Sequence, residues 1–452
     1  MTTSFELDSS AAHPGAPTTN PLTHVLHKNT RELPVKVVRG SGAYVWDEHG
    51  TRFLDASSGL NVVVGIGHAV PEIIDAMRAQ AELITFCGGF SSEPQEQLAK
   101  AIADRAPGDL NYVRFTSGGS EAAETAIKLA RQYFLERGKP SKWKVIGRWK
   151  SFHGNTLGAL AASGHTWRRA KYTPYLSDFP HIPPAHSLED ADALEVAILN
   201  EGPDDVAAFI AEPVVGAADF GRMAPGGYYE RIREICNRYD ILFITDEVMT
   251  GFGRTGKFWG IEHWDAVPDV MMFAKGASSG YMPLGGVVVS DRIHHQIDAG
   301  TKSFEHGHTY NGNPLACAVG LAVLKYIDDH NLVEASAANG KYLLGQLRAA
   351  LSHKPNIGEV IGAGMMNGIQ IVADKERRVA FPESARILAR IGAATRARGI
   401  LINPGFDSQS LPTDPQRIGV CPPLIFTREQ IDTTVTALTE AIDEVLADAV
   451  GL

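Results

Sequence analysis

The chain has 452 residues, 44% of them hydrophobic and 21% charged, which is typical of a globular protein with room for more than one domain. Its formal net charge of -10 argues against a nucleic-acid partner, because such partners select a basic surface. No apolar stretch is long enough to cross a bilayer, and the first residues do not resemble a secretory signal, so we expect a cytoplasmic protein without a membrane partner.

The N-terminal residues 1–69 are expected to form an arm and a hairpin. About the first twenty residues are rich in Ser, Thr, Ala and Pro, a composition typical of a mobile arm. In the later stretch GAYVWDEHGTRFLDASSG, two alternating segments flank His49-Gly50, which predicts a β-hairpin. We expect this hairpin to join the C-terminal part of the chain in a smaller domain.

Residues 70–330 are predicted to form a large α/β domain. Helical patterns alternate here with short runs that are apolar throughout, as in the central strands of a mainly parallel sheet. These runs are YVRFTS (112–117), WKVIGR (143–148), VAAFIAEPV (206–214), ILFITD (241–246), VMMFAK (270–275) and GGVVVS (285–290). Residues 331–452 change to mixed patterns and are expected to form the smaller α+β domain, with an amphipathic helix over about 428–449.

Three polar features follow strands of this predicted sheet. Asp246 ends one strand, Lys275 ends another, and TSGGSEAAETAIKLAR (116–131) follows a third. Because ligands of a parallel sheet bind beyond the C-terminal ends of its strands, we expect the three features to meet. In the third, Ser120 is the expected N-cap of a helix whose free N–H groups suit a phosphate. Each feature alone has a structural explanation, as a capped helix start, a dipole partner or an exposed lysine.

Together, the phosphate site, the carboxylate and the lysine indicate one ligand with a phosphate, a cationic ring atom and an aldehyde. Pyridoxal phosphate carries all three groups. A carboxylate beside the pyridine nitrogen favours the protonated ring, and burial beside a cationic ring lowers the pKa of a lysine that must act as a base. No metal is expected, because no His, Cys and Asp residues have the spacing of a metal site. The cysteines are also scattered, which suits a reduced compartment: Cys87, Cys236, Cys317 and Cys421.

Two longer stretches carry a resemblance to a known family. FITDEVMTGFGRTGKFWG (243–260) followed by PDVMMFAKGASSGYMPLGG (268–286) resembles the signature of the class III aminotransferases, which are pyridoxal-phosphate enzymes of fold type I. The likeness covers about residues 30–445 and continues through GLNVVVGIGH, SGGSEAAETAIKLAR, SFHGNT, AEPVVGA, HGHTYNGNPLACA and CPPLIFT. It implies a large domain with a mainly parallel seven-stranded sheet flanked by helices, and a smaller α+β domain.

The resemblance also implies roles for single residues. Lys275 would form a Schiff base with the cofactor and move a proton, and Asp246 would pair with the ring nitrogen, so these two are the expected catalytic residues. The other expected cofactor-binding residues are Gly119 and Ser120 at the phosphate, Phe152 and Val248 on the two ring faces, His153 beside Phe152, Glu212 behind the ring, and Thr309 at the phosphate of a neighbouring subunit. Taken singly, several of these could be ordinary structural residues, and His153, like His68, could be a hydrogen-bonded part of the scaffold. A homodimer or a dimer of dimers is expected, because Thr309 would complete the neighbour's site.

Part of the expected substrate site also comes from the resemblance. Many related enzymes have Trp where this chain has Asn61. Phe86 and Phe90, in FCGGF, resemble the aromatic wall that a partner subunit contributes. This lining suits an ω-amino acid or a primary amine as donor, with a 2-oxo acid, pyruvate first, as acceptor in a ping-pong reaction.

The substrate carboxylate needs a partner that the resemblance does not supply directly. Where related enzymes place an arginine for it, this chain has Asn403 and Gly419. Arg417 is the nearest candidate, although it could equally be a solvated loop residue. A cation is still required, because an unpaired buried carboxylate is costly.

Two alternative functions are compatible with parts of the pattern. An aminomutase or a racemase would keep the cofactor and change the reaction. A cofactor-sensing regulator would need a basic DNA-binding segment ahead of the core, and the short, polar N-terminal arm leaves no room for one.

Overall fold

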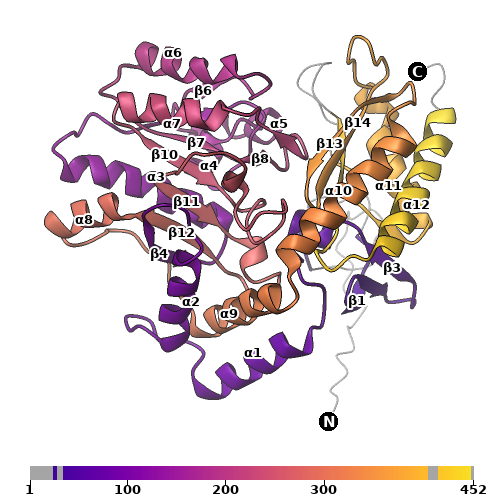
Figure 1. Cartoon of the computed structure of the whole chain (residues 1–452), viewed down its shortest axis with the longest axis horizontal. Helices are drawn as coiled ribbons and strands as arrows, with labels where there is room; N and C mark the ends of the chain where they lie inside the picture. Colours follow the sequence, from indigo (N-terminus) through magenta and orange to yellow (C-terminus); the bar gives the residue numbers. More distant parts are fainter. Residues whose placement is uncertain (1–23, 28–33, 406–415, 449–452) are drawn as a thin grey trace, which may run out of the picture.

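The computed structural model of the chain describes residues 24–27, 34–405 and 416–448 (Figure 1). A sheet with helices on both sides occupies the left of Figure 1, and a smaller group of helices and strands lies to its right. The expected N-terminal arm and the end of the expected C-terminal helix at Ala449 fall outside the described residues. Within the described ranges, none of the helices combines the length and the apolar character needed to cross a membrane.

The larger part of the described chain is built on a seven-stranded sheet. Its strands are β4 (Leu110–Thr116), β5 (Lys144–Arg148), β6 (His181–Ile182), β7 (Val206–Ala211), β10 (Leu242–Asp246), β11 (Val270–Phe273) and β12 (Gly285–Ser290). They lie in the order β4-β12-β11-β10-β7-β5-β6, and only the pairs that include β12 are antiparallel. The predicted mainly parallel sheet is confirmed. Each predicted apolar run overlaps one of these strands, whereas the two residues of β6 are too short a run to recognise.

Both faces of this sheet are covered, which explains why its strands are apolar throughout. On β10, Leu242 and Ile244 belong to one apolar cluster and Phe243 to the other, because alternate side chains of a strand point to opposite faces. On the first face the cluster is completed by α3 (Gly119–Glu136), α4 (Leu157–Ala162) and α8 (Asp291–Ala299). On the second it is completed by α1 (Pro71–Leu83), α2 (Glu93–Ala103), α6 (Asp192–Glu201), α7 (Tyr228–Arg238) and α9 (Pro314–Asp329).

The smaller part combines an antiparallel sheet with three long helices. The strands are β13 (Ile357–Ala363), β14 (Met366–Ile371) and β16 (Arg417–Val420), and the helices are α10 (Leu332–Leu351), α11 (Ile387–Ala397) and α12 (Arg428–Ala447). The predicted amphipathic C-terminal helix is α12. It begins at a capping box, in which the Thr427 hydroxyl accepts from the Gln430 N–H and the Gln430 side chain accepts from the Thr427 N–H.

The predicted hairpin is formed by β2 (Tyr44–Asp47) and β3 (Arg52–Asp55), which are antiparallel. Its turn is held by the Asp47 carboxylate, which accepts from the N–H groups of His49 at 2.9 Å and Thr51 at 2.8 Å. β1 (Val37–Ser41) pairs with β2, and β15 (Ile400–Leu401) runs parallel to β3. This pairing places the hairpin beside the C-terminal part of the chain, while the limits at residues 69 and 330 stay a prediction.

Candidate active site

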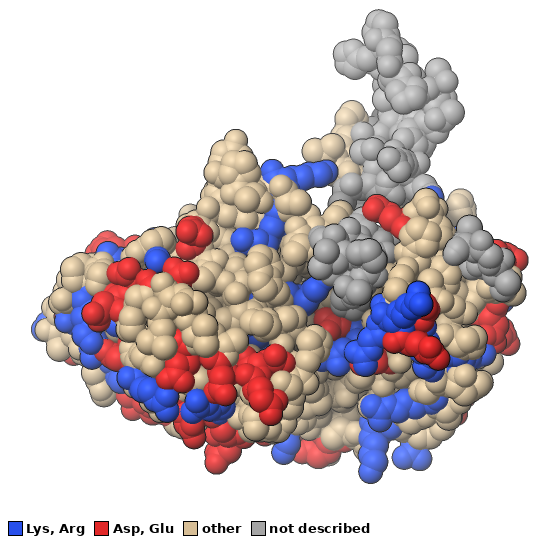
Figure 2. Space-filling view, turned by 90° about the horizontal axis from the view of Figure 1, so that it is seen from above, with Lys and Arg blue, Asp and Glu red and all other residues tan. Residues whose placement is uncertain are grey.

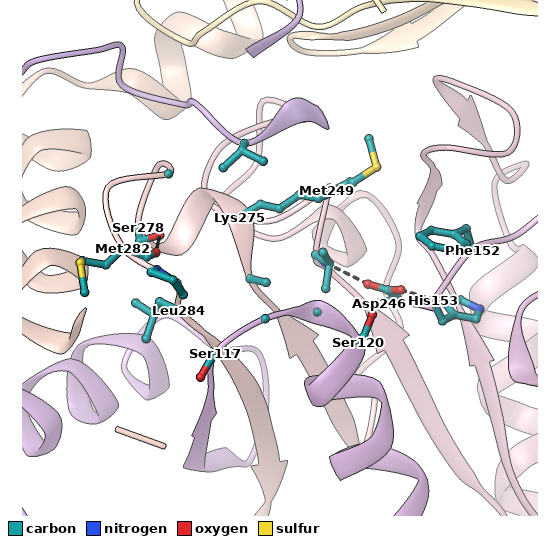
Figure 3. Close-up of a pocket in the computed structure, with 18 of the residues that line it drawn as sticks. Ser117, Ser120, Phe152, His153, Asp246, Met249, Lys275, Ser278, Met282 and Leu284 are labelled. Atoms are coloured by element: carbon teal, nitrogen blue, oxygen red, sulfur yellow. Dashed lines mark hydrogen bonds and ion pairs between the residues drawn. The ribbon is translucent and has the colours of Figure 1, made fainter. Parts of the chain in front are cut away.

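Asp246 and Lys275 meet at one edge of the large sheet. β10 and β11 are parallel neighbours, with Asp246 opposite Met272. Lys275 follows the end of β11 and begins the short 3-10 turn η5 (Lys275–Ala277). Because parallel strands end at the same edge of a sheet, both side chains line one cavity of about 420 Å³ (Figure 3). The predicted cofactor residues at this cavity are Gly119, Ser120, Phe152, His153, Glu212, Asp246, Val248 and Lys275.

The carboxylate of Asp246 is buried and held from two sides. Its Oδ2 lies 2.8 Å from Nδ1 of His153, and its Oδ1 accepts from the Val248 N–H at 3.0 Å. The residues Asp246 and His153 are both only 3% exposed. In Figure 3 the two side chains point toward each other beneath Phe152. His153 thus lies at the cavity as the family pattern suggested, and it is also the hydrogen-bonded histidine of the alternative interpretation.

Lys275 has an unusual backbone and a shifted pKa. Its φ of 42° lies in the left-handed region, which is uncommon for a residue with a side chain and is concentrated at functional sites. Removal from water lowers the pKa of Lys275 to about 8, against the opposing effect of the carboxylates of Asp246 and Glu212, and the charge of Arg168 lowers it further. About a tenth of this amine is therefore neutral and nucleophilic at pH 7, a much larger fraction than for a lysine of ordinary pKa.

Glu212 connects the cavity wall to its surroundings. Its Oε1 accepts from the Phe152 N–H at 3.0 Å, and its Oε2 accepts from the Gly216 N–H at 2.7 Å. Burial, and then the nearby charge of Asp246, raise the pKa of Glu212. The side chain therefore fixes the backbone of the loop that carries Phe152.

The start of α3 supplies backbone N–H groups to the same cavity. The helix begins at Gly119 and its N-cap is Gly118, so the prediction of Ser120 as N-cap is wrong. The Ser120 hydroxyl instead accepts from the Asn155 N–H at 3.1 Å. A Cβ on Gly119 would lie 3.0 Å from the Val248 side chain, which would have to move aside, so glycine suits this close approach. The first N–H groups of a helix have no partner within it and favour an anion.

The whole chain resembles proteins of known family. A family model described as aminotransferase class-III matches residues 25–442. The chain is a class III aminotransferase. It is 38% identical to the uncharacterised aminotransferase YodT of Bacillus subtilis, over 89% of this chain and 93% of YodT. It is 34% identical to the putrescine–pyruvate aminotransferase of Pseudomonas aeruginosa, over 93% of each chain. The crystal structure of a thermostable (S)-enantioselective ω-transaminase from Thermomicrobium roseum superposes with a TM-score of 0.87 at 38% identity, covering 95% of this chain and 96% of that one.

This aminotransferase uses pyridoxal phosphate, and the residues at the cavity fit that cofactor. The buried carboxylate of Asp246 suits a protonated ring nitrogen, and the Lys275 amine suits an aldehyde. The start of α3 suits the phosphate, because a Cβ on Gly118 would meet no atom within 4 Å and the backbone there is open to the cavity. Within the described ranges no group of three His, Cys, Asp or Glu side chains could hold a metal ion.

Phe86, Phe90 and Thr309 lie together at a second cavity of about 400 Å³. This cavity shares none of its lining residues with the cavity of Lys275. Phe90 is 81% exposed, and Phe86 packs edge-on against Tyr310 with ring centroids 5.8 Å apart. Their expected contribution to the active site of a neighbouring subunit stays a prediction.

The structure does not bring Arg417 to the cavity of Lys275. Its guanidinium is buried and forms ion pairs with Asp219 and with Glu359, the latter at 2.6 Å. The solvated-loop alternative does not apply either, because Arg417 begins β16 and is 4% exposed. Asn61 is exposed on the turn η1 (Ser58–Val62), and Val63, two residues further on, lines the cavity instead.

Several residues at the cavity were not singled out from the sequence. Met249, Ser278, Met282 and Leu284 line it and are labelled in Figure 3. All four lie within the two stretches that resemble the family signature. Their orientation toward the cavity depends on turns after β10 and β11 that have no periodic pattern, so only the folded chain reveals it.

Proposed function

We propose that this aminotransferase moves the amino group of an ω-amino acid or a primary amine to a 2-oxo acid, with pyruvate as the favoured acceptor, in a ping-pong reaction. One observation carries the proposal. Among the described residues Lys275 is the only Lys or Arg that lines the cavity, and much of the remaining wall is apolar, including Val63, Met249 and Leu284. This lining offers no arginine for a carboxylate, so it favours the uncharged chain of an amine donor, and the carboxylate of the acceptor needs a cation from outside the lining.

Each residue of the cavity would have a separate role in the reaction. Bound pyridoxal phosphate supplies an aldehyde for the amino group and a ring that withdraws electrons. Asp246 would keep the ring nitrogen protonated, and the start of α3 would hold the phosphate. Lys275 would move the proton at the substrate Cα, a role that suits an amine whose pKa is about 8. Phe152 and Val248 would bound the two faces of the ring.

Arg168 is our candidate for the carboxylate of the acceptor. It lies on α5 (Thr166–Arg169), and its Cζ is 4.1 Å from the centroid of the Phe152 ring. Its charge also acts on Lys275, so its guanidinium lies within electrostatic range of the cavity. A small acceptor such as pyruvate would need this one cation only. The relative from Pseudomonas aeruginosa that is named for putrescine and pyruvate supports the same choice.

We also propose that the active enzyme is a homodimer or a dimer of dimers. Thr309, Phe86 and Phe90 would complete the site of the neighbouring subunit from the second cavity. The exposure of both aromatic rings favours this arrangement, because large exposed apolar side chains that cluster mark interaction surfaces.

The test is a panel of donors and acceptors. Diamines, ω-amino acids, monoamines and α-amino acids would each be paired with pyruvate and with 2-oxoglutarate, and the keto product and the aminated acceptor would be quantified. We expect amines and ω-amino acids with pyruvate to give the highest kcat/KM, and equal amounts of the two products. Arg168→Met should raise the KM for pyruvate and leave the KM for the amine unchanged, with Arg168→Lys in between. A strong preference for glutamate as donor would contradict the proposal.

A further inference from the structure

A third cavity, of about 260 Å³, lies between the two parts of the molecule and has a basic lining. Its Lys and Arg residues are Lys150, Arg222, Arg377, Arg378 and Arg417, against the two acids Asp219 and Glu359. It shares none of its lining with the cavity of Lys275. Figure 2 shows basic and acidic side chains gathered together on the right-hand part of the molecule, on the face seen from above.

The two acids are fully engaged by two arginines. Arg417 Nε pairs with Asp219 and its Nη2 lies 2.6 Å from Glu359, while Arg222 reaches Asp219 at 3.1 Å and Glu359 at 2.5 Å. Burial opposes ionisation of Glu359, but the hydrogen bonds and charges of Arg417 and Arg222 lower its pKa to about 2. Both acids therefore neutralise these two arginines, while the exposed side chains of Arg378 and Arg377 make only longer ion pairs, to Glu359 at 3.4 Å and to Asp374 at 3.8 Å.

One buried donor of this network has no acceptor. Nη1 of Arg417 is buried and makes no hydrogen bond within the described part of the chain, although the residue is only 4% exposed. A buried guanidinium N–H without an acceptor is unfavourable, so this position favours an added oxygen. Arg378 is 64% exposed at its side chain, touches Glu359 at 3.4 Å, and can turn toward such a ligand.

We propose that this cavity binds a small oxyanion, a carboxylate or a phosphate, whose oxygens accept from Nη1 of Arg417 and from the guanidinium groups of Arg377 and Arg378. Arginine is suited to this task because its planar N–H groups match the oxygens of both anions. The volume admits an anion of a few heavy atoms and is below the range of sites for larger ligands.

The oxyanion site is joined to the active site through two loops. Lys150 precedes Phe152 by two residues, and Asp219 lies seven residues after Glu212 in the segment between β7 and α7. The ligand could therefore be a free anion such as phosphate or the anionic end of a substrate. Binding at the oxyanion site does not depend on the proposed donor and acceptor.

The experiment compares the thermal unfolding of the holoenzyme in phosphate and in chloride at equal ionic strength. With tens of millimolar phosphate we expect Tm to rise by about 2 to 4 °C above its value in chloride. The double variant Arg377→Gln/Arg378→Gln should lose this rise. Arg52→Gln/Arg396→Gln, which changes the net charge equally at exposed positions outside the cavity, should retain it.

The visible absorbance of the bound cofactor is recorded in parallel, because it must stay constant if phosphate acts away from the cofactor. Equal Tm values in the two salts, or a rise that survives in the first double variant, would overturn the proposal. The buried Arg417 is left intact, so misfolding does not confuse the result.

The KM values for two amines then identify the source of the anion. If the ligand is the end of a substrate, the first double variant should raise the KM for 4-aminobutyrate severalfold and leave the KM for butylamine unchanged. If the ligand is a free anion, both KM values should be unchanged while the Tm response to phosphate is lost. Either result supports the oxyanion site. Inactivity of the wild type toward both amines would contradict the proposed function and would leave the Tm test of the oxyanion site unaffected.

Discussion

Nδ1 of His153 lies 2.8 Å from Oδ2 of Asp246, in a buried pair that joins the loop after β5 to the end of β10. The two residues are 93 positions apart in the chain. The imidazole occupies one carboxylate oxygen and the Val248 N–H occupies the other, so the carboxylate cannot rotate freely. His153 is therefore a positioning residue for Asp246.

Removal of this imidazole should weaken catalysis and cofactor binding together. In His153→Ala we expect kcat and the affinity for pyridoxal phosphate each to fall about 10- to 100-fold, as is typical when the partner of a functional side chain is lost. His153→Asn keeps a side chain that can donate a hydrogen bond, and it should recover part of the loss. Steady-state rates and cofactor titration of the apoenzyme measure both effects. Unchanged cofactor affinity in the alanine variant would show that Asp246 is held without His153.

The pKa of Lys275 predicts the pH dependence of cofactor loading. Only the neutral amine attacks the cofactor aldehyde, so the rate constant for reconstitution of the apoenzyme should rise about tenfold per pH unit and level off above about 8. Stopped-flow absorbance would follow the reaction. The control is Glu247→Gln, which removes a neighbouring buried acid whose pKa burial raises to about 7, and it should leave the midpoint unchanged. A midpoint near 10.5 would contradict the shift.

Glu247 should affect stability in a pH-dependent way. The side chain accepts from the N–H groups of Gly260 at 2.7 Å and Ile261 at 2.8 Å, and also from the Thr250 hydroxyl. Its folded pKa of about 7 exceeds its ordinary value of 4.5, so between these two pH values the folded state holds a proton that the unfolded chain has lost. The unfolding free energy therefore falls as pH rises from 4.5 to 7. The full loss is roughly 3 kcal/mol.

The measurement is the difference in denaturation midpoint between the wild type and Glu247→Gln across this pH range. Glutamine does not titrate, so the difference should move in favour of the variant as pH rises from 5 to 7. The variant itself should be less stable than the wild type at pH 5, because an amide has one acceptor oxygen for several donors. A difference that is constant with pH would contradict the raised pKa.

A shared active site predicts complementation between two defective chains. Lys275→Ala should be inactive, and Thr309→Ala should be active only at high cofactor concentration if Thr309 holds the phosphate of the neighbouring site. A hybrid dimer of the two would contain one site with both changes and one intact site. Mixing, denaturing and refolding the two variants together at low cofactor concentration should therefore restore part of the wild-type rate. If each chain built its site alone, the mixture would have no such gain.

The sequence by itself predicted the large sheet and the chemistry at its edge. Strands buried on both faces are apolar throughout, so most of them could be located without a structure. Parallel strands also end at one edge, which is why Asp246 and Lys275 could be expected at one ligand although 29 positions separate them. The family signature around both residues then identified the reaction class.

Only the tertiary structure decided the contacts of residues whose partners are remote in the chain. Arg417 looked available for a substrate carboxylate, but Asp219 and Glu359, 198 and 58 positions away, bind it in a buried network. Ser120 resembled an N-cap, but the N-cap is Gly118, two residues earlier, and Gly119 begins the helix in close contact with the Val248 side chain. Local patterns reveal periodicity and capping, whereas ion pairs and close contacts between distant segments exist only once the chain has folded.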